Sequence, residues 1–447
     1  MIRGSLRAVS GIVVLLVSMV LLGCSGPGSG GASPVATAAA TAMPASTIAR
    51  PTATPLTAAV GSSVATAIVP LASPTATIPA PTPARTAAIA TAPVASRAAE
   101  GSATPSAPVT PAVQSSTGPL PPAYRIAFVS TSGGSDDIWT MDPDGRRLTN
   151  LTKTQKAKGN DSDPQWSPDG RRIAFVSDRD GNPDIWVMNV DGSGARNLTR
   201  APADDVNPRW SPDGRRIVFV AFRDGDAELY AMNADGSEQT NLTKADGDDL
   251  QPAWSPDGAQ IAFVSERQKK PRGLYVLSID APKTPTRVAA PPCDMGNPAW
   301  SPDGRTLAVV ACLGADGQGG PDPLIHAVYS IPAAGGNLTT VSEPKLDSGG
   351  PTWSADGRML AFWTYRTTQQ AEIVLVTVGA NERRVIQAPP GVAREPAWSL
   401  DSTTLAFVGG DFTIGNVIVA DLGGLSHNIT NHAANDRSPR WSPQKLP

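Results

Sequence analysis

The sequence is poor in the residues from which most catalytic sites are built. It has three histidines, three cysteines and no G-x-S-x-G motif in 447 residues. A histidine-based metal site and a serine-hydrolase nucleophile elbow are therefore both poorly supported. We expect neither enzymatic activity nor a bound cofactor.

Residues 25–122 lack the means to build a hydrophobic core. They contain no Phe, Trp or Tyr in a background of Ala, Thr, Ser and Pro, and their only charges are Arg50, Arg85, Arg97 and Glu100. Such a composition cannot bury enough apolar surface to fold. We predict a disordered linker over residues 24–122, with a reach of about 55 Å as a flexible coil. Its Thr, Ser and Pro content would also suit O-glycosylation.

The N-terminus carries a targeting signal. Two arginines precede an apolar run from Ala8 to Leu22, which is short for a membrane span, and the run leads into Leu-Leu-Gly-Cys ending at Cys24. This ending resembles a bacterial lipobox, so we predict a lipoprotein signal peptide over residues 1–23 and lipidation of Cys24. An ordinary secretory peptide and an uncleaved anchor are the alternatives. Each of them places the rest of the chain outside the cytoplasmic membrane.

The C-terminal three quarters of the chain is built from a repeat. Trp-Ser, usually followed by Pro-Asp-Gly, recurs every 43 to 53 residues, at Trp166, Trp210, Trp254, Trp300, Trp353, Trp398 and Trp441. Each copy but the last is followed by a β-type run close to Ile-Ala-Phe-Val, and proline and glycine suit the tight turn between the two. A period in the low forties made of short strands predicts a β-propeller whose blades have four strands.

The two ends of the repeat complete each other. Seven Ile-Ala-Phe-Val-type strands begin at Ile126, Ile173, Ile217, Ile261, Leu307, Leu360 and Leu405. The first has no Trp strand before it, and the last Trp strand, residues 438–443, has no such strand after it. We therefore predict an all-β fold with seven blades over residues 123–447, in which the C-terminal strand completes blade one and closes the ring.

The stretch from 166 to 199, WSPDGRRIAFVSDRDGNPDIWVMNVDGSGARNLT, resembles the WD-like repeat of TolB-type β-propellers. The resemblance extends over nearly all of residues 124–447 and implies the fold. It also implies a role in the cell envelope, where the family works with a peptidoglycan-associated lipoprotein. TolB, however, resembles six blades behind a small α/β domain, whereas this chain has seven repeats behind a low-complexity segment.

Aspartates recur in the loops that enter the Trp strands. Five residues before the tryptophan stand four that are consecutive around the predicted ring, namely Asp436, Asp161, Asp205 and Asp249, and one residue earlier stand Asp204 and Asp248. Loops at this point surround one mouth of a propeller channel, so we predict an acidic mouth that binds a cationic peptide segment or a divalent cation such as calcium. The alternative is that aspartates simply favour tight turns before proline.

Two cysteines are placed to pair. Cys293 and Cys312 lie on the two arms of the hairpin that turns at residues 301–304, and they are opposite each other if Ser301 pairs with Gly304. A disulfide is the prediction, in a compartment that permits it, and two free buried thiols are the alternative.

Charge excludes one class of partner. Residues 1–122 hold five arginines and one glutamate of the chain's 37 basic and 40 acidic residues, which leaves a formal net charge of −7 on the rest. No basic stripe stands out, so nucleic acid is not expected as a partner. We expect a monomeric, membrane-anchored extracytoplasmic propeller that binds an envelope protein or peptide. The alternative is a metal-dependent carbohydrate-active or other enzyme that uses the acidic mouth.

Overall fold

A computed structural model of the chain describes residues 124–153, 159–268, 271–280, 284–290, 293–314, 322–380, 382–411 and 413–443. The predicted signal peptide, Cys24 and the linker lie outside these residues. Contacts separate Val113–Pro447 as one compact unit. The part of the chain that the structure describes contains no helix long and apolar enough to cross a membrane.

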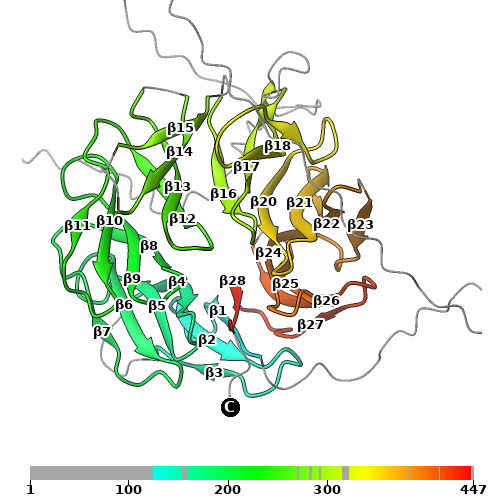
Figure 1. The fold of residues 1–447 in the computed structure, drawn as a ribbon. Helices are drawn as coiled ribbons and strands as arrows, with labels where there is room; N and C mark the ends of the chain where they lie inside the picture. Colours follow the sequence, from blue (N-terminus) through cyan, green and yellow to red (C-terminus); the bar gives the residue numbers. More distant parts are fainter. Residues whose placement is uncertain are drawn as a thin grey trace, which may run out of the picture. The chain divides into compact units, whose positions relative to one another are not determined.

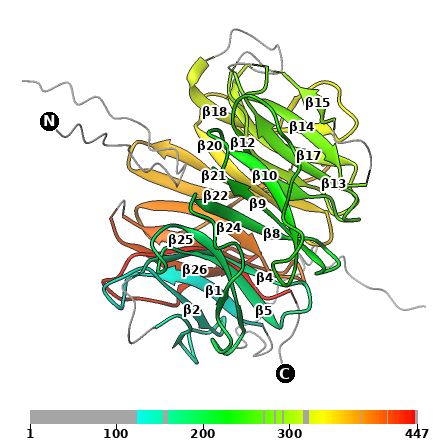
Figure 2. The same ribbon diagram turned by 90° about the vertical axis from the view of Figure 1, so that its left-hand side faces the viewer.

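The described residues form seven antiparallel four-stranded sheets arranged around a common axis (Figures 1 and 2). Blade one pairs β28 (Asp436–Trp441) with β1 (Ile126–Ser130), β2 (Asp137–Met141) and β3 (Thr149–Asn150). The predicted seven blades and the closure of the ring by the C-terminal strand are confirmed.

The other six blades follow in chain order, each from its inner to its outer strand. Blade two is β4 (Asp161–Trp166), β5 (Arg172–Ser177), β6 (Asp184–Asn189) and β7 (Arg196–Asn197); blade three is β8 (Asp205–Trp210), β9 (Arg216–Ala221), β10 (Glu228–Asn233) and β11 (Thr240–Asn241); blade four is β12 (Asp249–Trp254), β13 (Gln260–Ser265), β14 (Gly273–Ser278) and β15 (Thr286–Ala289). Blade five is β16 (Gly296–Trp300), β17 (Thr306–Leu313), β18 (Asp322–Pro332) and β19 (Thr339–Thr340); blade six is β20 (Ser348–Trp353), β21 (Met359–Thr367), β22 (Gln370–Thr377) and β23 (Arg383–Ile386); blade seven is β24 (Val392–Trp398), β25 (Thr404–Gly410), β26 (Gly415–Asp421) and β27 (Ser426–Asn428).

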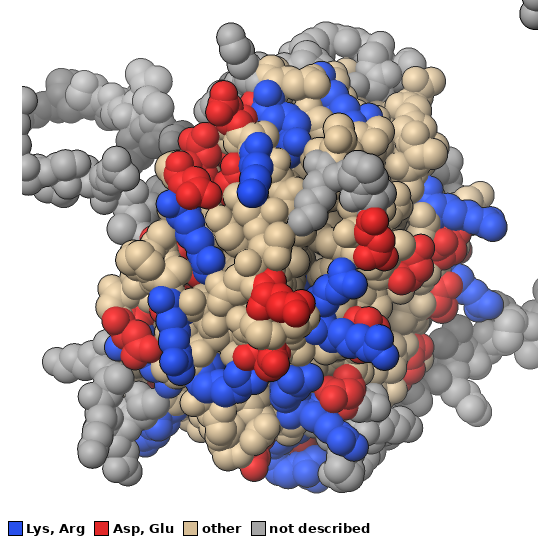
Figure 3. Space-filling view, turned by 60° about the vertical axis from the view of Figure 1, so that its left-hand side comes forward, with Lys and Arg blue, Asp and Glu red and all other residues tan. Residues whose placement is uncertain are grey.

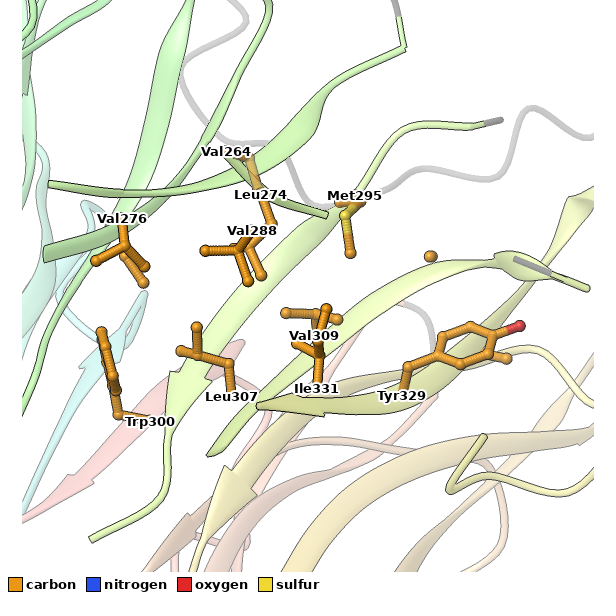
Figure 4. Packing of buried hydrophobic residues seen from close by; sticks show 13 residues of the cluster. Val264, Leu274, Val276, Val288, Met295, Trp300, Leu307, Val309, Tyr329 and Ile331 are labelled. Atoms are coloured by element: carbon orange, nitrogen blue, oxygen red, sulfur yellow. The ribbon is translucent and has the colours of Figure 1, made fainter. Parts of the chain in front are cut away.

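The hydrophobic core lies between the blades rather than inside any one of them. Each of seven clusters of buried side chains joins two adjacent sheets. In the cluster between blades four and five, Val276 and Val288 of one sheet face Trp300 and Leu307 of the next (Figure 4). Because every second and third strand is apolar on both faces, a blade is stable only with a neighbour on either side.

The seven repeat tryptophans tie the blades together around the axis. Each indole Nε1–H donates to the carbonyl oxygen of the residue just before the tryptophan of the preceding blade, at 3.0–3.2 Å. The bond from Trp166 to the Arg440 carbonyl crosses the seam between the first and last strands. A buried indole needs such a partner, and this explains why the repeat keeps tryptophan at this position.

Candidate functional site

The four aspartates that the sequence singles out each begin an inner strand. Asp161, Asp205, Asp249 and Asp436 pair in register with the last residue of the second strand in their own blades. All four are at most 2% exposed. The structure therefore places these carboxylates inside their blades and not on an open rim, which corrects the geometry of the expected acidic mouth.

In blades two to four an arginine covers the aspartate. In blade two the Arg179 Nη2 atom lies 2.8 Å from both Asp161 oxygens, and its guanidinium carbon lies 4.7 Å from the centre of the Trp186 ring. We call this set of three side chains the arginine stack. It occurs twice more: Arg223 lies between Asp205 and Tyr230 in blade three, and Arg267 between Asp249 and Tyr275 in blade four.

Burial raises the pKa of Asp205 and of Asp249, and the Arg223 and Arg267 guanidiniums oppose the rise. With the arginine in place, each pair is held by charge-assisted hydrogen bonds that also position the loop after the second strand.

Asp204 and Asp248, which directly precede Asp205 and Asp249, form hydrogen bonds with the backbone. The Asp248 Oδ1 atom accepts the N–H of Ala227 at 3.0 Å, just before β10 begins, while the main-chain oxygen of Asp204 accepts the N–H of Phe222. Burial, with a smaller contribution from Asp184, raises the pKa of Asp204. Their role in binding a partner stays a prediction, since the contacts of both residues here are within the propeller.

Blade one is the exception, because Ser132 occupies the position of the arginine. Both Asp436 oxygens are buried and neither accepts a hydrogen bond from the residues that the structure describes. The nearest charged group is the His432 Nε2 atom, 3.6 Å away. Burial raises the pKa of Asp436, and the Ser130 and Thr430 hydroxyls and His432 offset only part of that rise.

The same place in blades five and six is stabilised in other ways. In blade five Met295 replaces the aspartate and is buried in the core, and a disulfide joins Cys293 to Cys312, with Cα atoms 6.0 Å apart. In blade six the hydroxyls of Ser348 and Thr364 lie 2.8 Å apart and share a hydrogen bond. The disulfide and the hydrogen bond each connect the start of the inner strand to the end of the second strand.

A ring of polar side chains surrounds the axis. The residue before the proline of the inner strand has a positive φ in every blade, at a β-bulge, and these residues are Asp163, Asn207, Gln251, Asn297, Gly350, Glu395 and Ser438. We call them the axial ring. Neighbours bond across blades: Asn207 Nδ2 donates to Asp163 at 3.2 Å, and Ser438 N–H donates to Glu395 at 2.6 Å. Six of the seven carry a side chain in a conformation that favours glycine.

Two guanidiniums project among the axial ring residues. Arg209 pairs with Asp163 at 3.0 Å, and Arg440 stands at the equivalent position in blade one. Burial opposes ionisation of Asp163, but Arg209, Arg440 and a hydrogen bond from Gln165 outweigh it and lower the pKa of this carboxyl. The axis therefore carries charges of both signs.

Reasoning from the sequence found the aspartates and missed their partners. The arginines lie 13 residues after the tryptophans of blades two, three and four, which are three of the four blades in which an aspartate lies five residues before the tryptophan. The recurrence of arginine at this position was a signal that the sequence contained. The axial ring gave a weaker one, a polar residue before the proline of each inner strand.

Neither the surface charge nor the residues that could bind a metal define the candidate site further. On the face shown in Figure 3, basic and acidic side chains are intermixed. Within the described ranges no group of three or more His, Cys, Asp or Glu side chains could hold a metal ion.

Comparisons with known proteins identify the propeller. The TolB β-propeller domain family matches residues 110–205 and 199–315. The match covers less than half of the chain, and the remaining blades repeat the same strand pattern. A search of curated protein sequences finds no match.

Solved structures share the fold at low sequence identity. A puromycin-hydrolyzing peptidase of Mycobacterium tuberculosis has a TM-score of 0.54 and 15% identity over 68% of this chain, which spans 53% of that one. Oligogalacturonate lyase from Vibrio parahaemolyticus has a TM-score of 0.51 and 16% identity, covering 68% of this chain and 84% of its own. TolB from Acinetobacter baumannii has a TM-score of 0.46 and 17% identity, with 71% of this chain and 66% of that chain covered. Such likenesses concern the fold alone.

Proposed function

We propose that this protein is an extracytoplasmic binding or scaffold propeller, tethered to the membrane through Cys24, whose partner is an envelope protein or peptide. The proposal adds a role in binding to the family match. Its targeting part rests on the lipobox-like sequence at Cys24 and the long Ala, Thr, Ser and Pro segment behind it.

One observation carries the binding role: the axial ring. Hydrogen-bonding side chains from six blades converge on the axis, and their backbone conformation is unfavourable for most residues other than glycine. Unfavourable backbone geometry that a fold maintains is concentrated at functional sites. A polar ring of this kind suits an extended polypeptide segment, whose main-chain groups need donors and acceptors along their length.

The experiment is capture from cell-envelope extract by the full chain in detergent, with identification of the retained protein. A double variant, Asn207→Gly with Asn297→Gly, removes two ring side chains and leaves the residue that blade six carries naturally. We expect at least a tenfold loss of capture, in line with the loss of hydrogen bonds to the partner.

A matched control makes the same kind of change away from the axis. Glu238→Gly with Lys244→Gly replaces two exposed residues that also have positive φ, and capture should remain as in wild type. Retention of no specific partner by the wild-type chain would contradict the binding role. Turnover of an oligosaccharide by the same preparation, dependent on added divalent cation, would favour the enzymatic alternative.

A further inference from the structure

Blade one contains the two outer members of the arginine stack without the middle one. Asp436 begins β28 as Asp161 begins β4, and Trp139 pairs with Phe128 as Trp186 pairs with Phe175. The loop between the second and third strands has the same length in blades one, two and three, so Ser132 aligns with Arg179 without a gap.

The missing arginine leaves two visible consequences. The Asp436 carboxylate is fully buried, yet no hydrogen bond from the described residues reaches either oxygen. Trp139 is only partly buried, whereas Trp186 and Tyr275, under their arginines, are 9% and 2% exposed. A buried carboxylate that has only the nearby Ser130 and Thr430 hydroxyls and no arginine is costly, and the cost is relieved when a cation binds.

Among the residues of blade one that the structure describes, no other cation takes the position of the arginine. Arg437, next to Asp436 in sequence, is bound to Asp136 through both of its terminal nitrogens. His432 approaches Asp436 from the loop between β27 and β28, but it is a single ring at 3.6 Å and its side chain is 27% exposed. The His432 Nδ1 atom accepts the N–H of Ala434 at 3.3 Å, a contact within the loop, so displacing the ring breaks no bond of a strand.

We propose that blade one binds an arginine side chain of a partner polypeptide, whose guanidinium takes the place that Arg179 holds in blade two. This rests on the proposed binding function and names the chemistry of the partner. The guanidinium displaces the His432 imidazole, pairs with Asp436 and stacks on Trp139. In blades two to four the chain itself demonstrates that this geometry accepts a guanidinium.

The site should prefer arginine to lysine. A guanidinium is planar, binds a carboxylate through two parallel N–H donors and stacks on an aromatic face, whereas an ammonium group is compact and strongly hydrated. The difference gives the experiment an internal comparison between two ligands of equal charge.

The test uses the full chain in detergent, labelled with 5-fluorotryptophan, and the peptide acetyl-Gly-Gly-Arg-Gly-Gly-amide with its lysine counterpart. The Trp139 signal is assigned from the Trp139→Tyr variant, since tyrosine is the residue of blades three and four. We expect the arginine peptide to shift this signal saturably and the lysine peptide to bind about tenfold more weakly.

The decisive variant is Ser132→Arg, which restores the repeat. The new side chain should occupy the site, shift the Trp139 signal in the absence of peptide and abolish peptide binding. Asp436→Asn should weaken binding about tenfold or more. Thr149→Arg, an exposed change on β3 of the same blade, adds equal charge and should leave binding unchanged.

Two results would overturn the proposal: undiminished binding of the arginine peptide by a folded Ser132→Arg protein, or no response of the Trp139 signal to the peptide in wild type. Either result leaves the binding function itself open to its own test. If wild type and Ser132→Arg capture the same envelope partner equally, the function stands and this site does not. If wild type captures nothing, the function fails irrespective of the peptide.

Discussion

Blade one and blades two to four differ at a single side chain, and the difference separates stability from function. All four blades bury an aspartate at the start of the inner strand, but only three neutralise it with an arginine of their own. In those three, the carboxylate holds two strands together. In blade one we identify no contribution of the same carboxylate to folding. It is therefore the better candidate for binding a ligand.

The widest test of the comparison removes the strand that carries Asp436. Deletion of residues 436–447 takes away the inner strand of blade one, exposes the edge of β1 and removes the Trp441 indole from the ring of hydrogen bonds. We expect loss of cooperative unfolding and aggregation, since an unpaired edge is a template for association. Circular dichroism melting and size-exclusion chromatography measure this; a truncated chain that melts like wild type would contradict closure.

The sharpest test compares the two kinds of aspartate directly. Asp205→Ala leaves Arg223 partly buried and unpaired, which should cost about 3–5 kcal/mol in the free energy of unfolding. Asp436→Ala removes a carboxylate that has no arginine and should cost less than about 1 kcal/mol. Chemical denaturation of the two variants under the same conditions decides it, and equal losses would show that blade one is no exception.

Blade five extends the comparison to a covalent tie. Replacing both Cys293 and Cys312 with serine removes the bridge that stands where other blades have an ion pair. For a closed loop of this size the expected loss is about 3 kcal/mol. Denaturation of the variant beside wild type, without reductant, measures it. Reductant added to the variant, which has no bridge to reduce, gives the background change in the free energy of unfolding. If the variant differs from wild type by no more than this background, the bridge contributes nothing to stability.

The smallest expected effect is the part of the pH dependence of stability that Asp436 contributes. Because burial raises the pKa of this carboxyl in the folded state, its ionised form opposes folding. The cost is absent below a pH of about 4, where the unfolded group is also protonated, and it grows as the pH rises through the raised pKa. The stability of Asp436→Asn relative to wild type should therefore increase from pH 4 to pH 7, as thermal melts across this range would show. A constant difference would contradict the assignment.

The sequence was sufficient to predict the blades but not the contacts within them. Spacing of the tryptophans and the count of apolar strands determine the number of sheets, because both reflect a repeat whose physics is local. The pairing of Asp161 with Arg179 depends on which residue of the second strand lies opposite the first, and a bulge in each inner strand shifts that register. The sequence therefore predicted an acidic mouth, whereas the four carboxylates are enclosed within their blades.

The seam between the first and last strands also determines how the propeller responds to a pull. The main chains of Arg125 and Ser442 are bonded to each other, with the Ser442 N–H donating to the Arg125 oxygen at 2.8 Å. β1 lies between β28 and β2 and bonds to both. Tension that enters through Tyr124 runs along β1 and strains both ladders in parallel, so they must slide together rather than open one bond at a time. If the chain is tethered through Cys24 as proposed, this seam is well placed to bear load between the membrane and a bound partner.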